Sequence, residues 1–124
     1  MITTSSILVE RLEIYAYHGC FDQEKKLGQR FTLDLTLHVD ISKSAESDEL
    51  EDTVDYGAVV GVTTKAFTER RFNLLEAAAR AVAQAVLAAY PRVTGIGVTL
   101  KKLSPPIPAS LGAVGVSLEF RRDA

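Results

Sequence analysis

The sequence has no tryptophan, one methionine and one cysteine among its 124 residues. The lone Cys20 cannot form an intrachain disulfide, which excludes a disulfide-stapled secreted domain and favours a reducing, cytoplasmic location. No apolar run approaches the roughly 20 residues that span a bilayer, and residues 1–6 lack the basic start and apolar block of a signal peptide. We therefore expect neither secretion nor a membrane partner.

The chain also has no excess of positive charge. Fourteen Lys and Arg against sixteen Asp and Glu leave a net charge of −2, so a nucleic acid partner is not expected. Hydrophobic residues make up 47% of the chain, which at this length is enough for one core without disulfides or metal. We expect a single domain over residues 1–124, with a small molecule as the remaining class of partner.

Motifs for metal binding and nucleophilic catalysis are also absent. The chain has two histidines, His18 and His38, and the spacing of His18, Cys20 and Glu24 matches no zinc motif. Cys-x-x-Cys, His-Glu-x-x-His, Gly-x-Ser-x-Gly and a Gly-rich phosphate loop do not occur. The sequence thus predicts no metal site and no serine nucleophile.

Period-two alternation is the clearest positive signal. From Gln29 to Ile41 every second residue is apolar, which is typical of a half-buried strand. A second alternating segment runs from Ile7 to Tyr17. The polar residues 18–28 join the two, and we expect an irregular loop there, longer than a hairpin turn and of the kind that carries function.

Helical spacing follows an acidic, Ser-rich crossing segment at residues 42–52. Apolar residues from Tyr56 onward form a helical stripe, with Thr53 or Asp55 as the N-cap. A second helix is expected over residues 73–90, where Pro91 helps to stop it.

Two more alternating segments, residues 96–100 and 114–120, end the chain. A Pro-rich connection at residues 104–108 lies between them and cannot continue a ladder of hydrogen bonds. The order strand, strand, helix, helix, strand, strand (ββααββ) predicts an α+β fold, an antiparallel four-stranded sheet with both helices on its apolar face. Because an open sheet leaves two edges unpaired, we also expect oligomerisation.

Lys102 continues the inward-facing positions of the third expected strand, whereas Lys101 points to the other face. An amine desolvated in this way is suited to act as a general base, because burial disfavours its charged form. The alternative is an ordinary solvated lysine at a strand end, and the pattern by itself favours that alternative.

Two further residues have both a structural and a chemical interpretation. Glu76 follows Asn73 by three positions, so it either completes a capping box or offers its carboxylate to the amidine-like edge of a flat heterocycle. Tyr56 opens the first helix with a titratable hydroxyl, although a buried tyrosine with a satisfied hydroxyl is the commoner case. The pattern by itself favours the structural interpretation for both.

Several short motifs, in this order and over nearly the whole chain, resemble the dihydroneopterin aldolase family. They are Tyr17-His18-Gly19 with Glu24, Gly28-Gln29 before a long strand, Asp52-Thr53-Val54-Asp55-Tyr56, Asn73-Leu74-Leu75-Glu76, and Lys102 ahead of Pro105-Pro106-Ile107-Pro108. The resemblance implies the tunnelling fold, in which four subunits close their sheets into a barrel and two such rings stack into an octamer. Such closure would pair the two free edges of the sheet.

The resemblance also implies an enzyme, a lyase that cleaves 7,8-dihydroneopterin into 6-hydroxymethyl-7,8-dihydropterin and glycolaldehyde in folate biosynthesis. No cofactor, metal or Schiff base is implied, because the imine of the substrate itself accepts the electrons. The catalytic residues implied are Lys102, Glu24 and Tyr56 of a neighbouring subunit, and the pterin-binding residues are Glu76, Leu75, Tyr56 and Val54. For Lys102, Glu76 and Tyr56, the resemblance therefore favours the chemical role over the structural one that the pattern by itself favours.

Two positions depart from the family pattern or leave a choice open. Leu103 stands where many members have proline after the catalytic lysine, so the choice of Lys102 over Lys101 depends on the Pro-rich register and on strand parity. Asp22 competes with Glu24 within the same loop. The alternative functions are an epimerase of the same fold acting on dihydroneopterin or its triphosphate, and a non-catalytic, ring-forming pterin-binding protein.

Overall fold

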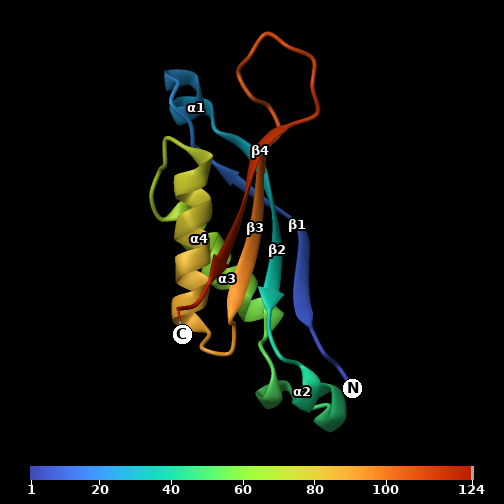
Figure 1. Ribbon diagram of the computed structural model, residues 1–124. Coiled ribbons are helices and arrows are strands. Elements are labelled where there is room, and N and C mark those ends of the chain that lie inside the picture. Colours follow the sequence, from blue (N-terminus) through green and yellow to red (C-terminus); the bar gives the residue numbers. More distant parts are fainter. Residues whose placement is uncertain (124) are drawn as a thin grey trace.

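The computed structural model describes residues 1–123 as an antiparallel sheet with helices on one face (Figure 1). Its elements are β1 (Ser6–Ala16), α1 (Asp22–Leu27), β2 (Gln29–His38), α2 (Ser42–Ser47), the 3-10 helix η1 (Leu50–Asp52), α3 (Tyr56–Thr68), α4 (Leu75–Ala89), β3 (Gly95–Lys102) and β4 (Val114–Arg121). The predicted α+β class with four antiparallel strands is confirmed, and the three short helical segments α1, α2 and η1 add to the six predicted elements. None of the helices within residues 1–123 is long and apolar enough to cross a membrane.

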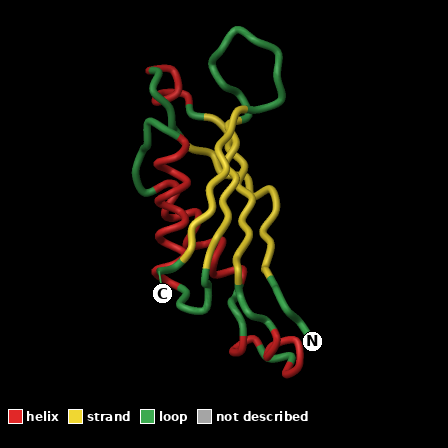
Figure 2. Tube along the Cα trace, in the orientation of Figure 1, coloured by secondary structure: helices red, strands yellow, loops and turns green. Residues whose placement is uncertain are grey.

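The four strands lie side by side in one sheet, yellow in Figure 2. They are hydrogen-bonded in the order β1-β2-β3-β4, and each neighbouring pair is antiparallel. The register of the central pair places Phe31 of β2 opposite Lys102 of β3, and His38 opposite Gly95. Lys102 therefore lies at the end of the sheet where β2 begins.

Alternation in β2 separates a core face from a polar face. Phe31, Leu33, Leu35 and Leu37 are at most 1% exposed. Both long helices cover this face, α4 against β3 and β4 and α3 against β1 (Figure 1). The strand predicted to reach Ile41 ends at His38, because the chain leaves the sheet there to form α2.

The start of α4 differs from the prediction. Leu74 occupies the N-cap position without a side-chain bond, and α4 begins at Leu75. The Asn73 Oδ1 instead accepts a hydrogen bond from Arg71 Nη2 at 2.5 Å. A charged donor gives the amide oxygen a stronger bond than a helix N–H would, and the capping-box interpretation of Glu76 is therefore wrong.

The remaining elements divide between the two ends of the sheet (Figure 1). Helix α1, the start of α4 and the connection at residues 103–113 gather at the end where β3 finishes at Lys102. Helix α2, η1 and the start of α3 lie at the opposite end. Tyr56, the first residue of α3, is thus separated from Lys102 by the length of the sheet within one chain.

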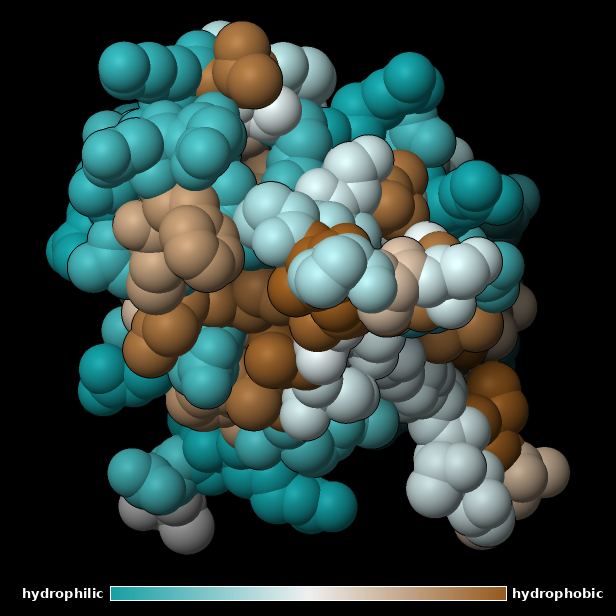
Figure 3. Space-filling view, turned by 90° about the horizontal axis from the view of Figure 1, so that it is seen from above, coloured by the Kyte–Doolittle hydropathy of each residue, from teal (hydrophilic) through white to brown (hydrophobic). Residues whose placement is uncertain are grey.

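Apolar side chains are exposed at the end of the sheet that carries Lys102, among hydrophilic ones (Figure 3). Five large apolar residues are exposed in three segments: at α1 and the residue before it, in the connection before α4, and in residues 103–113. They are Phe21, Leu27, Leu74, Ile107 and Leu111. Because they come from three separate segments, this end offers several apolar contacts to a partner surface.

Asp55 is the N-cap of α3, one of the two predicted candidates. Its Oδ1 accepts hydrogen bonds from the backbone N–H groups of Gly57 at 2.9 Å and Ala58 at 3.4 Å. We expect Asp55→Ala to lower the free energy of unfolding by about 1 kcal/mol, and Asp55→Asn, which keeps an acceptor, to change it by less than about 0.5 kcal/mol. Chemical denaturation of the three proteins measures both values, and equal stability of the Ala and Asn variants would contradict the capping role.

Candidate active site

A buried ion pair lies at the end of the sheet where β3 finishes. The Lys102 Nζ bonds to the Glu24 Oε2, and the two side chains are 12% and 6% exposed. Lys101, one residue earlier, is exposed. Lys102 therefore has the inward orientation that strand parity predicts, and it is not a solvated strand end. An amine and a carboxylate held together away from bulk water form a pair suited to proton transfer.

Glu24 reaches Lys102 from α1. The sequence predicts an irregular loop here, but six residues form this helix, with acidic side chains in its first turn and basic ones in its last turn, as the helix dipole favours. The Glu24 Oε1 accepts a hydrogen bond from the Phe21 backbone N–H at 3.3 Å, which anchors the carboxylate. Asp22 is exposed, so Glu24 is the carboxylate of this segment that contacts Lys102.

Gly19 makes room for the Glu24 carboxylate. Its φ is +144°, a backbone conformation that favours glycine, and a Cβ at this position would lie 2.2 Å from the Glu24 Cδ. Its own N–H donates to the Phe72 carbonyl at 3.0 Å. A larger residue at position 19 would push the carboxylate away from Lys102.

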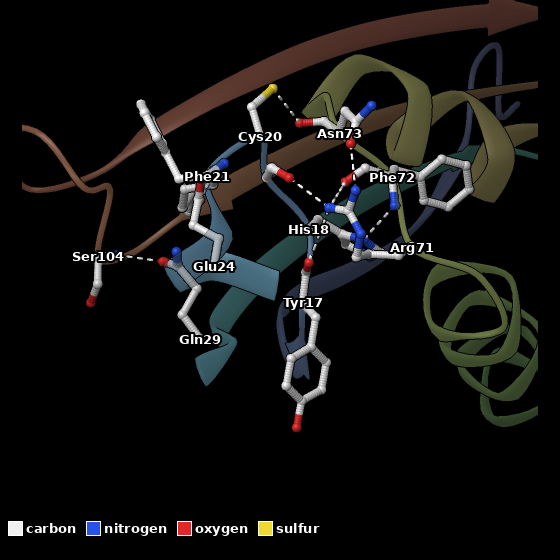
Figure 4. A network of polar contacts seen from close by, with 12 residues as sticks. Tyr17, His18, Cys20, Phe21, Glu24, Gln29, Arg71, Phe72, Asn73 and Ser104 are labelled. Atoms are coloured by element: carbon white, nitrogen blue, oxygen red, sulfur yellow. Dashed lines mark hydrogen bonds and ion pairs between the residues drawn. The ribbon is translucent and has the colours of Figure 1, made fainter. Parts of the chain in front are cut away.

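His18 is buried beside this segment (Figure 4). Its Nδ1 accepts a hydrogen bond from the Phe72 N–H at 3.0 Å, so its Nε2 carries the proton and donates to the Phe67 carbonyl at 2.8 Å. The rings of Phe31, Phe67 and Phe72 surround it at centroid distances of 5.5, 4.5 and 5.3 Å. Backbone groups thus occupy both ring nitrogens, and residues 1–123 contain no cluster of three or more metal-ligating side chains.

The first turn of α4 supplies a second set of polar groups at the same end of the sheet. No side chain caps this helix, so the N–H groups of its first turn remain available, beside the half-buried Leu75 and the exposed Glu76. Glu76 lines a cavity of about 480 Å³ together with Arg70, Arg80 and apolar side chains of β4. A carboxylate next to free N–H groups can pair with the amidine-like edge of a flat heterocycle.

Val54 and Tyr56 lie at the opposite end of the sheet. Val54 is 4% exposed and Tyr56 is 67% exposed, so the interpretation of Tyr56 as a buried tyrosine is wrong. Arg92 fixes the residues just before them by donating to the carbonyls of Asp52 at 2.8 Å and Glu51 at 2.9 Å. The Tyr56 side chain is therefore exposed on a helix start that Arg92 holds in place.

Asp52 holds the crossing segment in place. Its carboxylate accepts a hydrogen bond from the Ser47 hydroxyl at 2.6 Å and pairs with Lys43 at 3.1 Å. The Ser47 bond, followed by the contact with Lys43, lowers the pKa of Asp52 below its ordinary value. The ionised carboxylate thus ties α2 and η1 together ahead of Val54 and Tyr56.

The structure brings Lys102 and Glu24 into contact and places Leu75 and Glu76 at the same end, but it does not bring Val54 or Tyr56 to them within one chain. Sequence reasoning missed the arginines that bond backbone carbonyls, Arg71 among them. Carbonyl acceptors belong to every residue type, so such bonds leave no trace in residue spacing. The role of Gly19 had a weak signal, since a glycine at the start of a polar segment suggests an unusual backbone conformation or a close approach.

The burial of His18 has a consequence for stability. Burial lowers the pKa of His18 below its ordinary value of 6.5; the Phe67 carbonyl opposes this shift, and the charge of Arg71 adds to it. Below about pH 6.5 the unfolded chain therefore binds a proton that the folded chain does not, so this contribution to stability is complete above that pH and is lost as the pH falls.

We expect His18→Gln, whose amide can accept from Phe72 and donate to Phe67 but does not titrate, to lose less stability than wild type between about pH 7 and pH 5. Urea denaturation of both proteins at the two pH values measures the difference. The same pH dependence in both proteins would show that His18 is not the group responsible.

Comparison with known proteins places the chain in a family. A family model of dihydroneopterin aldolase (FolB) matches residues 7–119. Dihydroneopterin aldolase of Methylorubrum extorquens is 39% identical over 112 residues, 90% of this chain and 86% of that protein. The protein of the same name from Streptococcus pyogenes serotype M18 is 39% identical over 116 residues, 94% of this chain and 98% of that protein.

Solved structures agree with the sequence relatives. The crystal structure of E. coli dihydroneopterin aldolase in complex with neopterin has a TM-score of 0.84 at 27% identity and covers 93% of this chain and 97% of that chain. A FolB protein of Vibrio cholerae has a TM-score of 0.89 at 27% identity, covering 98% and 100%. The chain therefore belongs to the dihydroneopterin aldolase family.

Proposed function

We propose that this protein is an aldolase that cleaves 7,8-dihydroneopterin into 6-hydroxymethyl-7,8-dihydropterin and glycolaldehyde, as a cytoplasmic step of folate biosynthesis. The observation that carries the proposal is the buried Lys102–Glu24 ion pair at the end of the sheet where α4 begins. Relatives named dihydroneopterin aldolase, 39% identical over most of the chain, support the same assignment. A single domain, residues 1–124, would carry the activity.

The proposed reaction is a retro-aldol cleavage. It breaks the bond between the two hydroxylated carbons nearest the ring, and the electron pair of that bond has to be held until the carbon left on the ring takes up a proton. The N5=C6 imine of the substrate accepts this pair by conjugation, so the reaction needs neither a Schiff-base lysine nor a metal ion as electron sink. The protein has to remove one proton from a side-chain hydroxyl and deliver one to carbon.

Lys102 fits the proton-transfer role. In its neutral form the amine takes the hydroxyl proton through a water molecule, and the resulting ammonium returns a proton to the carbon that stays on the ring. The protonation state of the protein is the same before and after the cycle. Glu24, anchored by the Phe21 N–H and packed against Gly19, orients the amine and the water.

Glu76 and the backbone of Leu75 fit the other end of the substrate. The 2-amino group and N3 of a pterin present two parallel N–H donors, which one carboxylate can accept in a planar pair. The backbone of Leu75 lies beside that edge. A site built on these bonds rejects analogues that lack the donors, because the carboxylate would then be left unpaired.

Tyr56 and Val54 would complete the site from a neighbouring subunit. Strand β3 is eight residues long, about 25 Å at roughly 3.3 Å per residue, and α3 begins at the end of the sheet opposite Lys102 (Figure 1). Strands β1 and β4 are the sheet edges and run in opposite directions, so β4 of one subunit can pair with β1 of the next and continue the antiparallel order. Four sheets joined in this way would form the tunnelling-fold ring. The exposed apolar end described above would then be the surface on which two rings stack into an octamer (Figure 3).

An epimerase of the same fold, acting on dihydroneopterin or its triphosphate, is the alternative. Arg70 and Arg80 line one cavity with Glu76, so in the proposed binding mode their charge lies beside the ring and not beside the phosphorylated side chain of such a substrate. Incubation with 7,8-dihydroneopterin and with its triphosphate, followed by separate assays for glycolaldehyde and for the side-chain epimer, distinguishes the two. Glycolaldehyde as the main product supports the aldolase; the epimer alone supports the epimerase, and a non-catalytic pterin-binding ring would give neither.

The role of Lys102 predicts a separation of catalysis from binding. We expect Lys102→Ala to lower the cleavage rate by at least about 100-fold, because the general base is lost. Affinity for neopterin, measured by calorimetry, should change by less than about threefold, since the groups at the start of α4 remain. Retained binding also verifies that the variant is folded although Glu24 has lost its partner.

Lys101→Ala is the matched control, because Lys101 is the exposed neighbour on the other face of the sheet. It should cleave at the wild-type rate. A Lys102→Ala rate within about tenfold of wild type, a loss of less than about 1.4 kcal/mol, would overturn the assignment, and an equal loss in Lys101→Ala would transfer it to that residue.

The shared site predicts complementation between two inactive proteins. Tyr56→Phe and Lys102→Ala chains, each poorly active alone, should regain activity when they are unfolded together and reassembled. Random mixing places an intact Tyr56 against an intact Lys102 at about a quarter of the subunit boundaries. Native mass spectrometry verifies the mixed oligomers; mixed oligomers no more active than the separately refolded parents would show that the two residues do not meet across a boundary.

A further inference from the structure

Arg71, in the connection between α3 and α4, bonds two segments that are 52 positions apart in the sequence (Figure 4). Its Nη1 donates to the Gly19 carbonyl at 2.5 Å, and its Nη2 donates to the Asn73 Oδ1 at 2.5 Å. Longer bonds from Nη1 reach the carbonyls of Phe72 at 3.4 Å and Tyr17 at 3.5 Å. One planar guanidinium thus joins the segment after β1 to the segment before α4.

The first of these segments controls the ion pair. Gly19, whose carbonyl accepts from Arg71, is the residue against which the Glu24 carboxylate packs, and Glu24 in turn holds Lys102. A shift of the Gly19 backbone would therefore move the carboxylate and, through it, the amine.

The second segment controls the start of α4. Asn73 lies two residues before Leu75 and three before Glu76, and α4 has no side-chain cap of its own to define where it begins. Because the Arg71 bond holds the Asn73 side chain, the position of the first turn of α4 depends on the same guanidinium.

We propose that Arg71 is a positioning residue that sets the separation between the Lys102–Glu24 pair and the Leu75–Glu76 edge. The inference rests on the proposed function, in which these two groups hold opposite ends of one rigid substrate. An error of about 1 Å in such a separation can cost a reaction about 100-fold in rate even when the substrate remains bound. Arginine suits this task because its planar fork donates in two fixed directions, whereas a lysine ammonium is a single flexible point.

The test compares Arg71→Lys with wild type in the cleavage of 7,8-dihydroneopterin. We expect kcat to fall by about 10- to 100-fold, because the charge remains but the fork is lost. KM and the calorimetric affinity for neopterin should change by less than about threefold, since the α4 edge still binds the ring. Arg30→Lys is the control: Arg30 is an exposed arginine on the polar face of β2, and this variant should keep the wild-type kcat.

Amide hydrogen exchange supplies a readout that is independent of catalysis. In Arg71→Lys, exchange should become faster both at residues 19–24 and at residues 72–76, while β2 and β3 keep their wild-type protection. A variant that merely loses global stability would instead show faster exchange throughout, with kcat per folded molecule unchanged. Arg71→Ala, examined in the same way, should enlarge both local effects.

The outcomes separate this inference from the proposed function. If wild type releases no glycolaldehyde, the proposed function fails, and hydrogen exchange alone decides whether Arg71 couples the two segments. If wild type is active and Arg71→Lys matches its kcat, the inference is overturned. It is also overturned if only affinity falls, or if only one of the two segments exchanges faster.

Discussion

Burial of Lys102 against Glu24 is the constraint on which the architecture of this end of the molecule depends. Two opposite charges removed from water lose more solvation than their attraction returns, unless further bonds satisfy them in a fixed geometry. Helix α1 meets this requirement by presenting Glu24 with the Phe21 N–H, and Gly19 meets it by leaving the space that a side chain would fill. The antiparallel register of β2 and β3 brings the lysine to the same place, opposite Phe31.

The parts of the fold that follow from local rules could be predicted from the sequence. Alternation along β2 and β3 identified the core face and the inward direction of Lys102, because successive strand residues point to opposite faces whatever lies around them. The capping interpretation of Glu76 failed for the opposite reason: Asn73 bonds to Arg71, a choice between two partners that residue spacing does not encode. Helix α1 was mistaken for a loop because six residues are too few to display a helical period, although their charges already suited the helix dipole.

Of the residues predicted for the site, the structure brings Lys102 and Glu24 together, and the roles of the others stay predictions. Lys102 meets Glu24 within one chain, but Tyr56 and Val54 begin at the other end of the sheet, and the sequence of one subunit does not state which chain will supply them. The unpaired edges β1 and β4 give the physical reason to expect a neighbour. In the proposed binding mode, α4 would hold one end of the substrate and β3 would act on the other, which leaves one face of the substrate open. An exposed tyrosine at a fixed helix start is suited to cover that face.

Helix α4 links these requirements, since it packs on β3 and β4 and runs between the two ends of the sheet. Arginines fix the chain at both of its ends by bonding backbone carbonyls: Arg71 bonds Gly19 before the helix starts, and Arg92 bonds Glu51 and Asp52 after it stops. The first contact holds the segment that leads to Glu24, and the second holds the segment that leads to Tyr56. A carbonyl acceptor is available at every position of a chain, so these bonds constrain the backbone without constraining the side chains around it. In the proposed site shared between subunits, one rigid helix would thus position both halves, as a reaction sensitive to the placement of a single amine requires.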